Sequence, residues 1–120
     1  MMAFEKPIPE INVHFLAAKL KSDEVFVLLD VRELFEEDRA KITDSRLTVM
    51  PMSRLSSEGV DALPESARLQ NAEIYVMCHH GVRSSDVTRW LVSQGWTNVF
   101  SVRGGIDAYA HEIDKTVGFY

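Results

Sequence analysis

The feature that most constrains the fold is a short apolar run, Ile74 to Met77, which ends in a cysteine and is followed by a glycine-containing loop. Polar residues precede the run, and Gly81 follows it closely. A continuous apolar run with these boundaries is typical of a strand buried on both faces of a parallel sheet. Ligands of open α/β sheets bind just beyond the carboxyl ends of such strands. The sequence therefore predicts a parallel sheet with a ligand-binding loop at residues 78–84.

The segment after Gly81 has the pattern of an amphipathic helix that stops at Gly95. Its stripe at helical spacing is formed by Val87, Trp90, Leu91 and Gln94. Ser84 belongs to the expected first turn, where the backbone amides have no helical partner. These amides and those of the loop can converge on the side chain of Cys78, and the helix dipole adds partial positive charge there. Such surroundings favour the thiolate form of a cysteine.

The rest of the chain alternates helix and strand signals, with no internal repeat, linker or low-complexity segment. In chain order we expect a helix capped by Asn12, a strand over 25–29, a short charged helix over 32–40, a weaker strand over 46–50, a short helix capped by Ser53, a strand over 99–102, a helix through Ile113 and a coil over 114–120. This alternation argues for parallel strands joined by right-handed crossovers. We predict one α/β domain over residues 1–120, with a central mainly parallel sheet of about five strands and helices on both faces.

Composition limits the classes of function. With 120 residues, 46% of them hydrophobic, the chain suits one compact domain with a core. The net charge of −5, without a basic run, argues against a nucleic-acid partner. No apolar stretch approaches the ~20 residues that span a bilayer, so we expect no membrane partner, and the start MMAFEKPIPEI lacks the apolar core of a signal peptide. Because Cys78 is the only cysteine, no intrachain disulfide can form, and we expect a cytoplasmic protein.

Four segments of the sequence resemble the rhodanese family. The loop CHHGVRS at 78–84 resembles the persulfide loop of its single-domain members, which typically has a glycine at the fourth position. LLDVRE at 28–33 resembles the Asp-x-Arg strand end of the family, MPM at 50–52 resembles the proline after its third strand, and VRGGIDAY at 102–109 resembles its Gly-Gly helix start. Each segment alone is a weak signal, but four in the same order and spacing are a specific one. The resemblance implies a three-layer rhodanese-like fold.

The resemblance also implies a thiosulfate sulfurtransferase with Cys78 as its catalytic residue. The thiolate would attack the outer sulfur of thiosulfate or a related sulfane donor and carry a persulfide. A small thiol, cyanide or a protein thiolate would then accept the sulfur. Backbone amides would stabilise the anionic persulfide within an expected substrate-binding loop of His79, His80, Gly81, Val82, Arg83 and Ser84. No cofactor and no metal is expected, because these loop histidines adjoin the cysteine and no second ligand pair has metal-site spacing.

Several of these residues have more than one role open to them. Asp30 and Arg32 are expected to give structural support at the rim of the sheet through a charge-assisted pair. Arg83 can bind an anionic substrate, or it can point away and hydrogen-bond neighbouring loops. We expect His79 and His80 at the rim of the pocket, where they either shape the loop or tune donor use by titrating near pH ~6.5.

Two other classes of function compete with sulfur transfer to small molecules. A phosphatase or arsenate reductase of the related cell-cycle phosphatase type shares the fold and the cysteine. Its loop needs one residue more between cysteine and arginine than separates Cys78 from Arg83, so the shorter ring favours sulfur. The other class is a sulfur-relay or interaction module, in which Cys78 receives sulfur from a partner protein and turns over little free thiosulfate. The sequence alone does not separate such a module from an enzyme that transfers sulfur to small molecules.

Overall fold

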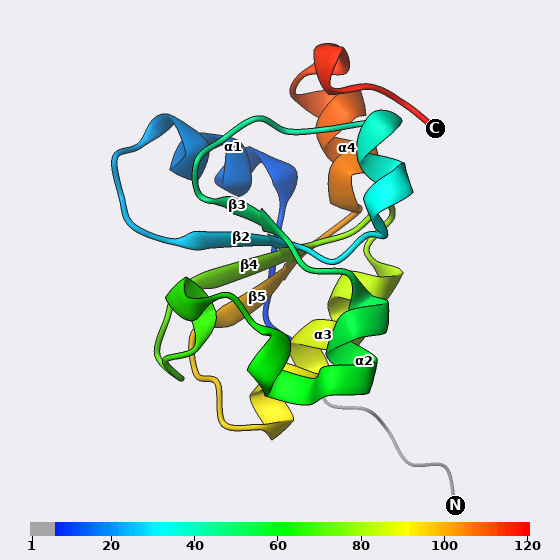
Figure 1. Cartoon of the computed structure of the whole chain (residues 1–120). Coiled ribbons are helices and arrows are strands. Elements are labelled where there is room, and N and C mark those ends of the chain that lie inside the picture. The colour runs from blue at the N-terminus through cyan, green and yellow to red at the C-terminus, as the bar shows by residue number, and fades with distance from the viewer. Residues whose placement is uncertain (1–6) are drawn as a thin grey trace, which may run out of the picture.

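The computed structural model describes residues 7–120, and five strands in this range form one parallel sheet (Figure 1). The strand order is β1-β5-β4-β2-β3, and the bounds are β1 (Glu10–Ile11), β2 (Val27–Asp30), β3 (Leu47–Val49), β4 (Ile74–Met77) and β5 (Val99–Val102). Every pairing is parallel, and β4 lies between β5 and β2. The predicted fold class is confirmed. Only β1 lacks a sequence signal, since two residues are too few to show a pattern.

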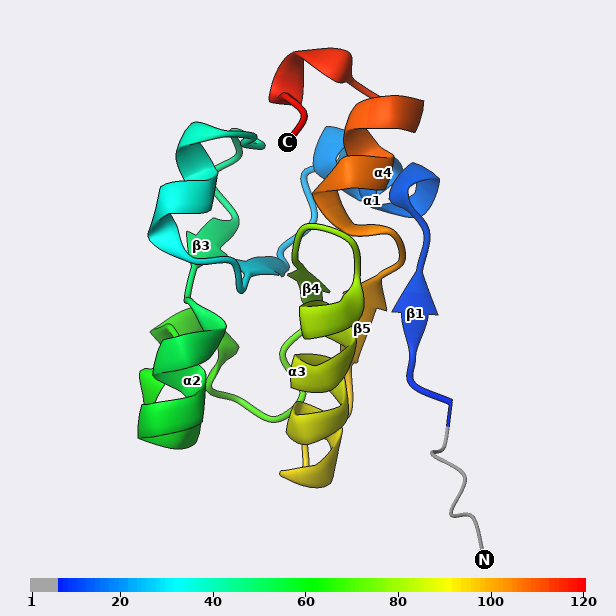
Figure 2. The ribbon, with the colours of Figure 1, turned by 90° about the vertical axis from the view of Figure 1, so that its right-hand side faces the viewer.

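Four α-helices cover the two faces of the sheet. Their bounds are α1 (Val13–Lys21), α2 (Met52–Glu58), α3 (Val82–Ser93) and α4 (Gly105–Glu112). Short 3-10 helices lie at η1 (Leu34–Asp38), η2 (Gly59–Ala62), η3 (Glu65–Ala67) and η4 (Lys115–Val117). Two views at right angles show α1 and α4 on one face and α2 and α3 on the other (Figures 1 and 2). Among residues 7–120, no helix combines the length and apolar character needed to cross a membrane.

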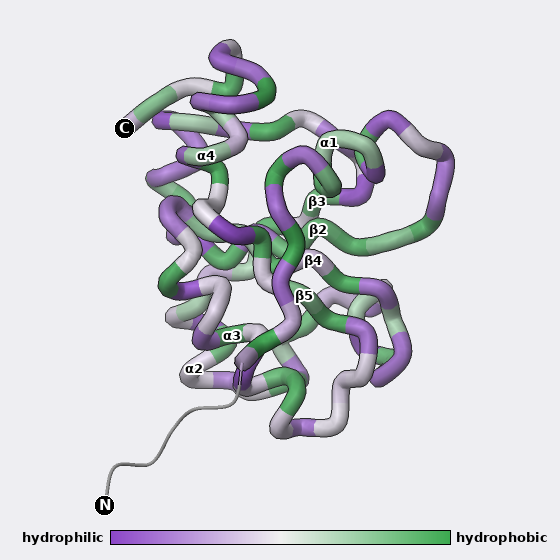
Figure 3. The backbone as a smooth tube through the Cα atoms, turned by 180° about the vertical axis from the view of Figure 1, so that it is seen from behind, coloured by the Kyte–Doolittle hydropathy of each residue, from purple (hydrophilic) through white to green (hydrophobic). Residues whose placement is uncertain are grey.

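Strand β4 supplies side chains to both hydrophobic cores. Ile74 and Val76 belong to the core beneath α2 and α3, whereas Tyr75 and Met77 belong to the core beneath α1 and α4. All four residues of β4 are buried, and so are all four of β2, which is hydrophobic throughout most of its length in Figure 3. Burial on both sides explains why these strands appear in the sequence as continuous apolar runs instead of alternating patterns.

The segment after β2 differs from the expected helix over 32–40. It forms only the 3-10 helix η1, which a capping box between Glu33 and Glu36 begins. Arg32 is fully buried outside this helix and pairs with Asp30, so it cannot take part in a helical first turn. The expected charged helix is therefore shorter and tighter than its sequence pattern suggests.

Two further local predictions are wrong. Ser53 does not cap a helix, because α2 begins directly after Pro51 and the Ser53 hydroxyl donates a hydrogen bond to Glu33 at 2.8 Å instead. The segment 114–120 is more than coil. It contains η4, capped by the side chain of Asp114, and the Val117 carbonyl accepts a hydrogen bond from the Lys41 amide at 2.8 Å. The packing of this tail brings Tyr120 to the site described next.

Candidate active site

Cys78 lies at the carboxyl end of β4, where the chain turns toward α3, and only 1% of it is exposed. The backbone amides of Gly81 and Ser84 donate hydrogen bonds to its Sγ at 3.0 and 3.3 Å. The Ser84 Oγ lies 3.5 Å from the same sulfur, in position to accept from a neutral thiol. Amide dipoles that point at one atom stabilise negative charge there. The loop is therefore a cradle suited to an anionic sulfur.

Two glycines give this loop its shape. Gly81 has a φ of 103°, a left-handed conformation that turns the chain so that its own amide faces the sulfur. Gly105 lies against the loop from α4, and a Cβ there would lie only 2.5 Å from the Cys78 carbonyl oxygen. This close approach lets the amides of Ile106 and Asp107 donate to the carbonyls of the first two loop residues at 2.9 and 3.0 Å. These two hydrogen bonds hold the loop against the start of α4.

Arg83 forms a bidentate pair with Glu36 of η1. The two nitrogen–oxygen distances are 2.7 and 2.9 Å, and the Tyr120 hydroxyl donates to the same carboxylate at 2.9 Å. The hydrogen bonds from Arg83 hold the pKa of Glu36 down at about 2, against the opposing effect of burial. Of the two orientations left open by the sequence, the structure has the second, in which Arg83 braces a neighbouring segment.

Asp30 and Arg32 form a fully buried ion pair at the end of β2, with a closest distance of 2.8 Å. The Arg32 guanidinium also donates to the Ala40 carbonyl at 2.9 Å and to the Tyr120 hydroxyl at 3.1 Å. Glu37 Oε2 lies 2.7 Å from Arg32, yet it completes no well-directed hydrogen bond. Burial, reinforced by Asp30, raises the pKa of Glu37 above its ordinary value. This cluster fixes the turn after β2 and makes no contact with the sulfur.

His79 lies in a stack of three rings. Its ring centroid is 3.7 Å from that of Tyr120, with planes 6° apart, and 3.8 Å from that of His80. Burial lowers the pKa of His79, and the neighbouring His80 lowers it further, so the neutral ring predominates near pH 7. His80 is exposed, and its Nδ1 lies 3.7 Å from Asp107.

His79, His80 and Asp107 are the residues in the described part of the chain that come nearest to a metal site, since one ligand atom of each lies within 4.8 Å of the others. The two imidazole planes differ by 31°, and the His79 Nε2 atom is buried without a hydrogen-bond partner. The expectation that the protein holds no metal stays a prediction.

Apolar side chains are exposed beside the loop. Leu34 and Phe35, next to Glu36 on η1, are 67% and 70% exposed, and Val82, next to Arg83 on α3, is 70% exposed. The ion pair between Glu36 and Arg83 joins the two segments, and each of these three exposed residues lies within two sequence positions of one of its partners.

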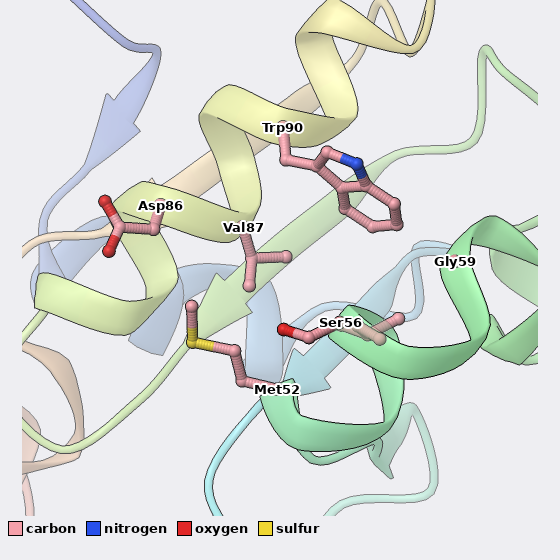
Figure 4. Close-up of a pocket in the computed structure, with 7 residues that line it drawn as sticks. Met52, Ser56, Gly59, Asp86, Val87 and Trp90 are labelled. Carbon is pink, nitrogen blue, oxygen red and sulfur yellow. The ribbon is translucent and has the colours of Figure 1, made fainter.

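A separate groove of about 340 Å³ runs between α2 and α3. It is lined by Met52, Leu55, Ser56, Gly59, Asp86, Val87 and Trp90. In Figure 4 the Met52, Val87 and Trp90 side chains border the space between the two helices, whereas the Asp86 carboxylate points away. Trp90 is partly buried and packs against the core beneath α2 and α3. The buried tryptophan is Trp96.

Sequence reasoning missed three polar residues around the loop. Glu36 and Tyr120 lie 47 and 84 residues from their respective partners Arg83 and Glu36, so no local pattern links them. Ser101 is fully buried in β5, and its Oγ lies 2.8 Å from that of Ser84. A serine inside the otherwise apolar strand VFSV was the available signal, because a buried hydroxyl needs a partner.

The fold and this loop define a parallel α/β protein with a cysteine cradle at the end of its central strand. The family model for the rhodanese-like domain matches residues 13–112, and the chain therefore belongs to the rhodanese-like family. It is 31% identical to the chloroplastic rhodanese-like/PpiC domain-containing protein 12 of Arabidopsis thaliana, over 100% of this chain and 40% of that protein. It is 32% identical to the putative sulfur carrier protein YrkF of Bacillus subtilis, over 82% of this chain and 49% of the relative.

Among solved structures, a rhodanese-related protein from Thermoplasma volcanium superposes with a TM-score of 0.69 at 30% identity, covering 88% of this chain and 93% of that one. The chain spans less than half the length of the two curated relatives. Their shared domain supports membership of a sulfur-transfer family.

Proposed function

We propose that this chain is a sulfurtransferase that carries sulfane sulfur as a persulfide on Cys78. The observation that carries the proposal is the pair of amides, from Gly81 and Ser84, that point at Sγ. The thiolate carries its charge on Sγ, and preorganised amides stabilise that charge without reorganisation during the reaction. Under this proposal, Cys78 is the catalytic residue and residues 79–84 form the substrate-binding loop.

The proposed donor is thiosulfate or a related sulfane compound. The Cys78 thiolate attacks the outer sulfur, a sulfur–sulfur bond forms to Sγ, and the bond to the sulfonate sulfur breaks with both electrons leaving on sulfite. The persulfide keeps the single negative charge of the thiolate. In the second step a thiophilic acceptor attacks the outer sulfur and the Cys78 thiolate is regenerated. With cyanide as the acceptor, the product is thiocyanate.

The direction of Arg83 argues against phosphate-ester chemistry. An arginine that clamps a phosphate directs both of its outer nitrogens at the ligand. Here both nitrogens of Arg83 are engaged by Glu36. Together with the short spacing between Cys78 and Arg83, this geometry favours sulfur over a tetrahedral phosphate.

A sulfur relay to a partner protein is the second candidate function, and two observations favour it. Leu34, Phe35 and Val82 are exposed on the two segments that the ion pair joins, and exposed apolar side chains of this kind can take part in protein contacts. The charge of Arg83 is neutralised by Glu36, which weakens its attraction for dianionic thiosulfate. One relative, YrkF, is named as a putative sulfur carrier. On this reading the acceptor, and also the donor, is a protein thiol.

The test is the intact mass of the folded, reduced protein after thiosulfate treatment and desalting. We expect a gain of one sulfur atom that cyanide or a reducing thiol removes, and no gain in Cys78→Ser. An unmodified mass at saturating thiosulfate would contradict transfer from this donor. Loading the same protein from a protein persulfide, and comparing cyanide with a dithiol as acceptor, then distinguishes the relay. A protein that takes sulfur from neither source is not a sulfurtransferase.

A further inference from the structure

A buried pair of hydroxyl groups lies behind the candidate sulfur site. Ser101 on β5 and Ser84 on α3 are both fully buried, and their Oγ atoms are 2.8 Å apart. Ser84 is also the residue that reaches Cys78 Sγ twice, through its amide and its side chain. Within residues 7–120, the Ser101 hydroxyl has no other hydrogen-bond partner. The loop is therefore connected to β5 through one hydroxyl pair.

The direction of these hydrogen bonds depends on the charge of the sulfur. The Ser84 hydroxyl has one hydrogen, and its neighbours are Cys78 Sγ, the Ser101 hydroxyl and the Gly81 carbonyl oxygen at 3.2 Å. A neutral thiol donates to Ser84, which leaves the Ser84 hydrogen for another acceptor. An anionic sulfur can only accept, so the Ser84 hydrogen must turn toward it.

When the Ser84 hydrogen rotates toward the sulfur, every acceptor around it still receives a hydrogen bond. The Gly81 carbonyl keeps two hydrogen bonds, from the Ser85 hydroxyl at 2.7 Å and from the Ser85 amide at 3.1 Å. The Ser84 oxygen then accepts from Ser101, because the Ser101 hydrogen has Ser84 as its only partner in the described chain. The result is a chain of two hydroxyls that ends on the sulfur of Cys78.

We propose that Ser101 is a positioning residue for this sulfur, because its donated hydrogen bond turns the Ser84 hydroxyl toward the thiolate of Cys78. Consecutive hydrogen bonds polarise one another, so the donor behind Ser84 strengthens the bond to the anion. The inference about the thiolate does not rest on the proposed function, whereas its consequence for the rate of persulfide formation does.

The experiment follows ionisation of the single cysteine directly. Protein labelled with carbon-13 cysteine reports the charge of Cys78 through its Cβ chemical shift, without any reagent that must reach the buried thiol. We expect Ser101→Ala to raise the midpoint of this titration by about 0.5 pH unit, a threefold smaller thiolate fraction at pH values well below the midpoint. Ser84→Ala removes the bond to the anion itself and should raise the midpoint by about 1 unit.

Matched variants separate the hydroxyl from its volume. Ser101→Thr and Ser101→Val have the same shape, and we expect only the valine variant to show the raised midpoint. Thr88→Val is the control, since it removes an equally buried hydroxyl of α3 that has no hydrogen-bond partner. The charged and titratable groups nearest the loop are Arg83 with Glu36, His79, and His80 with Asp107, and all are unchanged in these variants.

A functional measurement completes the test. At pH values below the titration midpoint, Ser101→Ala should lower the rate constant for persulfide formation from thiosulfate about threefold. The rate constant should recover at high pH, whereas a merely structural defect would lower it at every pH. Equal midpoints for Ser101→Thr and Ser101→Val would overturn the inference. A shifted titration in a protein that never accepts sulfur would leave the hydroxyl chain in place and overturn the proposed function instead.

Discussion

The ion pair between Glu36 and Arg83 makes a quantitative prediction about acid stability. The folded protein holds the pKa of Glu36 at about 2, against an ordinary value of 4.5. A depressed carboxyl pKa stabilises the folded state above the unfolded pKa, and this stability is lost as the pH falls from 4.5 toward 2. The difference of 4.5 minus 2 corresponds to about 3 kcal/mol at neutral pH, and about 2 kcal/mol of it is lost by pH 3.

The perturbation is Glu36→Gln, which keeps the size of the side chain and removes its charge. Unfolding by urea should show that the variant is less stable than the wild type at pH 7, and that this gap narrows by about 2 kcal/mol at pH 3. The partial exposure of Arg83 lets solvent screen the pair, so these magnitudes are upper values.

Glu58→Gln provides the matched control. Glu58 also forms a bidentate pair with an arginine, Arg54, but both side chains are about half exposed on α2. Solvent screens such a pair, and its removal should change stability little at either pH. A gap between Glu36→Gln and wild type that stays constant from pH 7 to pH 3 would refute the assigned charge state of Glu36.

Three further predictions address specificity and the surrounding network. Aryl phosphates should not be turned over under conditions in which thiosulfate is consumed, and phosphatase activity that Cys78→Ser abolishes would contradict this. Replacing His79 and His80 together by alanine should flatten the acidic side of the pH profile of kcat/KM for thiosulfate, most clearly at low salt, because protonated rings attract the dianion; superimposable profiles would show that the rings lie off the donor's path. Because the pKa of Glu37 is raised, the stability that its neutral form provides is present below pH 4.5 and is lost as the pH rises through the folded pKa. Glu37→Gln should therefore raise the melting temperature more at pH 9 than at pH 6, and an equal change at both would refute the raised pKa.

The parts of the fold that were predictable have local causes. The bounds of β4 and β5 match the predicted runs, because a strand buried on both faces must be apolar throughout and polar or glycine residues mark where it ends. The prediction of a helix over residues 32–40, after β2, was wrong for the opposite reason. The charged pattern of this segment is local. The burial of Arg32 against Asp30 and the Ala40 carbonyl is a tertiary contact, and it overrides helix propensity.

The orientation of Arg83 shows where local reasoning about the site stops. The convergence of loop amides on Cys78 follows from the order of strand, glycine turn and helix, all within seven residues of sequence. Whether Arg83 faces the substrate depends on Glu36, from a different crossover, and on Tyr120, from a tail without any periodic pattern. Such contacts bring together segments 47 and 84 residues apart, and a single sequence has no local pattern that encodes them.

These distant contacts also determine what the site can recognise. Without Glu36, Arg83 would be a cation in the loop that holds the sulfur, and an anionic donor would be attracted to it. With Glu36 in place, the cradle stabilises an anion mainly through amide dipoles, which act on the sulfur at 3.0 to 3.3 Å and attract a distant anion only weakly. The structure therefore separates two tasks that a free arginine would combine. Under the proposed function, the loop backbone stabilises the bound sulfur, and we expect recruitment of the donor to depend on the exposed residues Leu34, Phe35 and Val82. A donor with apolar surface around its sulfur should consequently outcompete thiosulfate at equal concentration, and Glu36→Gln should narrow that preference by releasing the charge of Arg83.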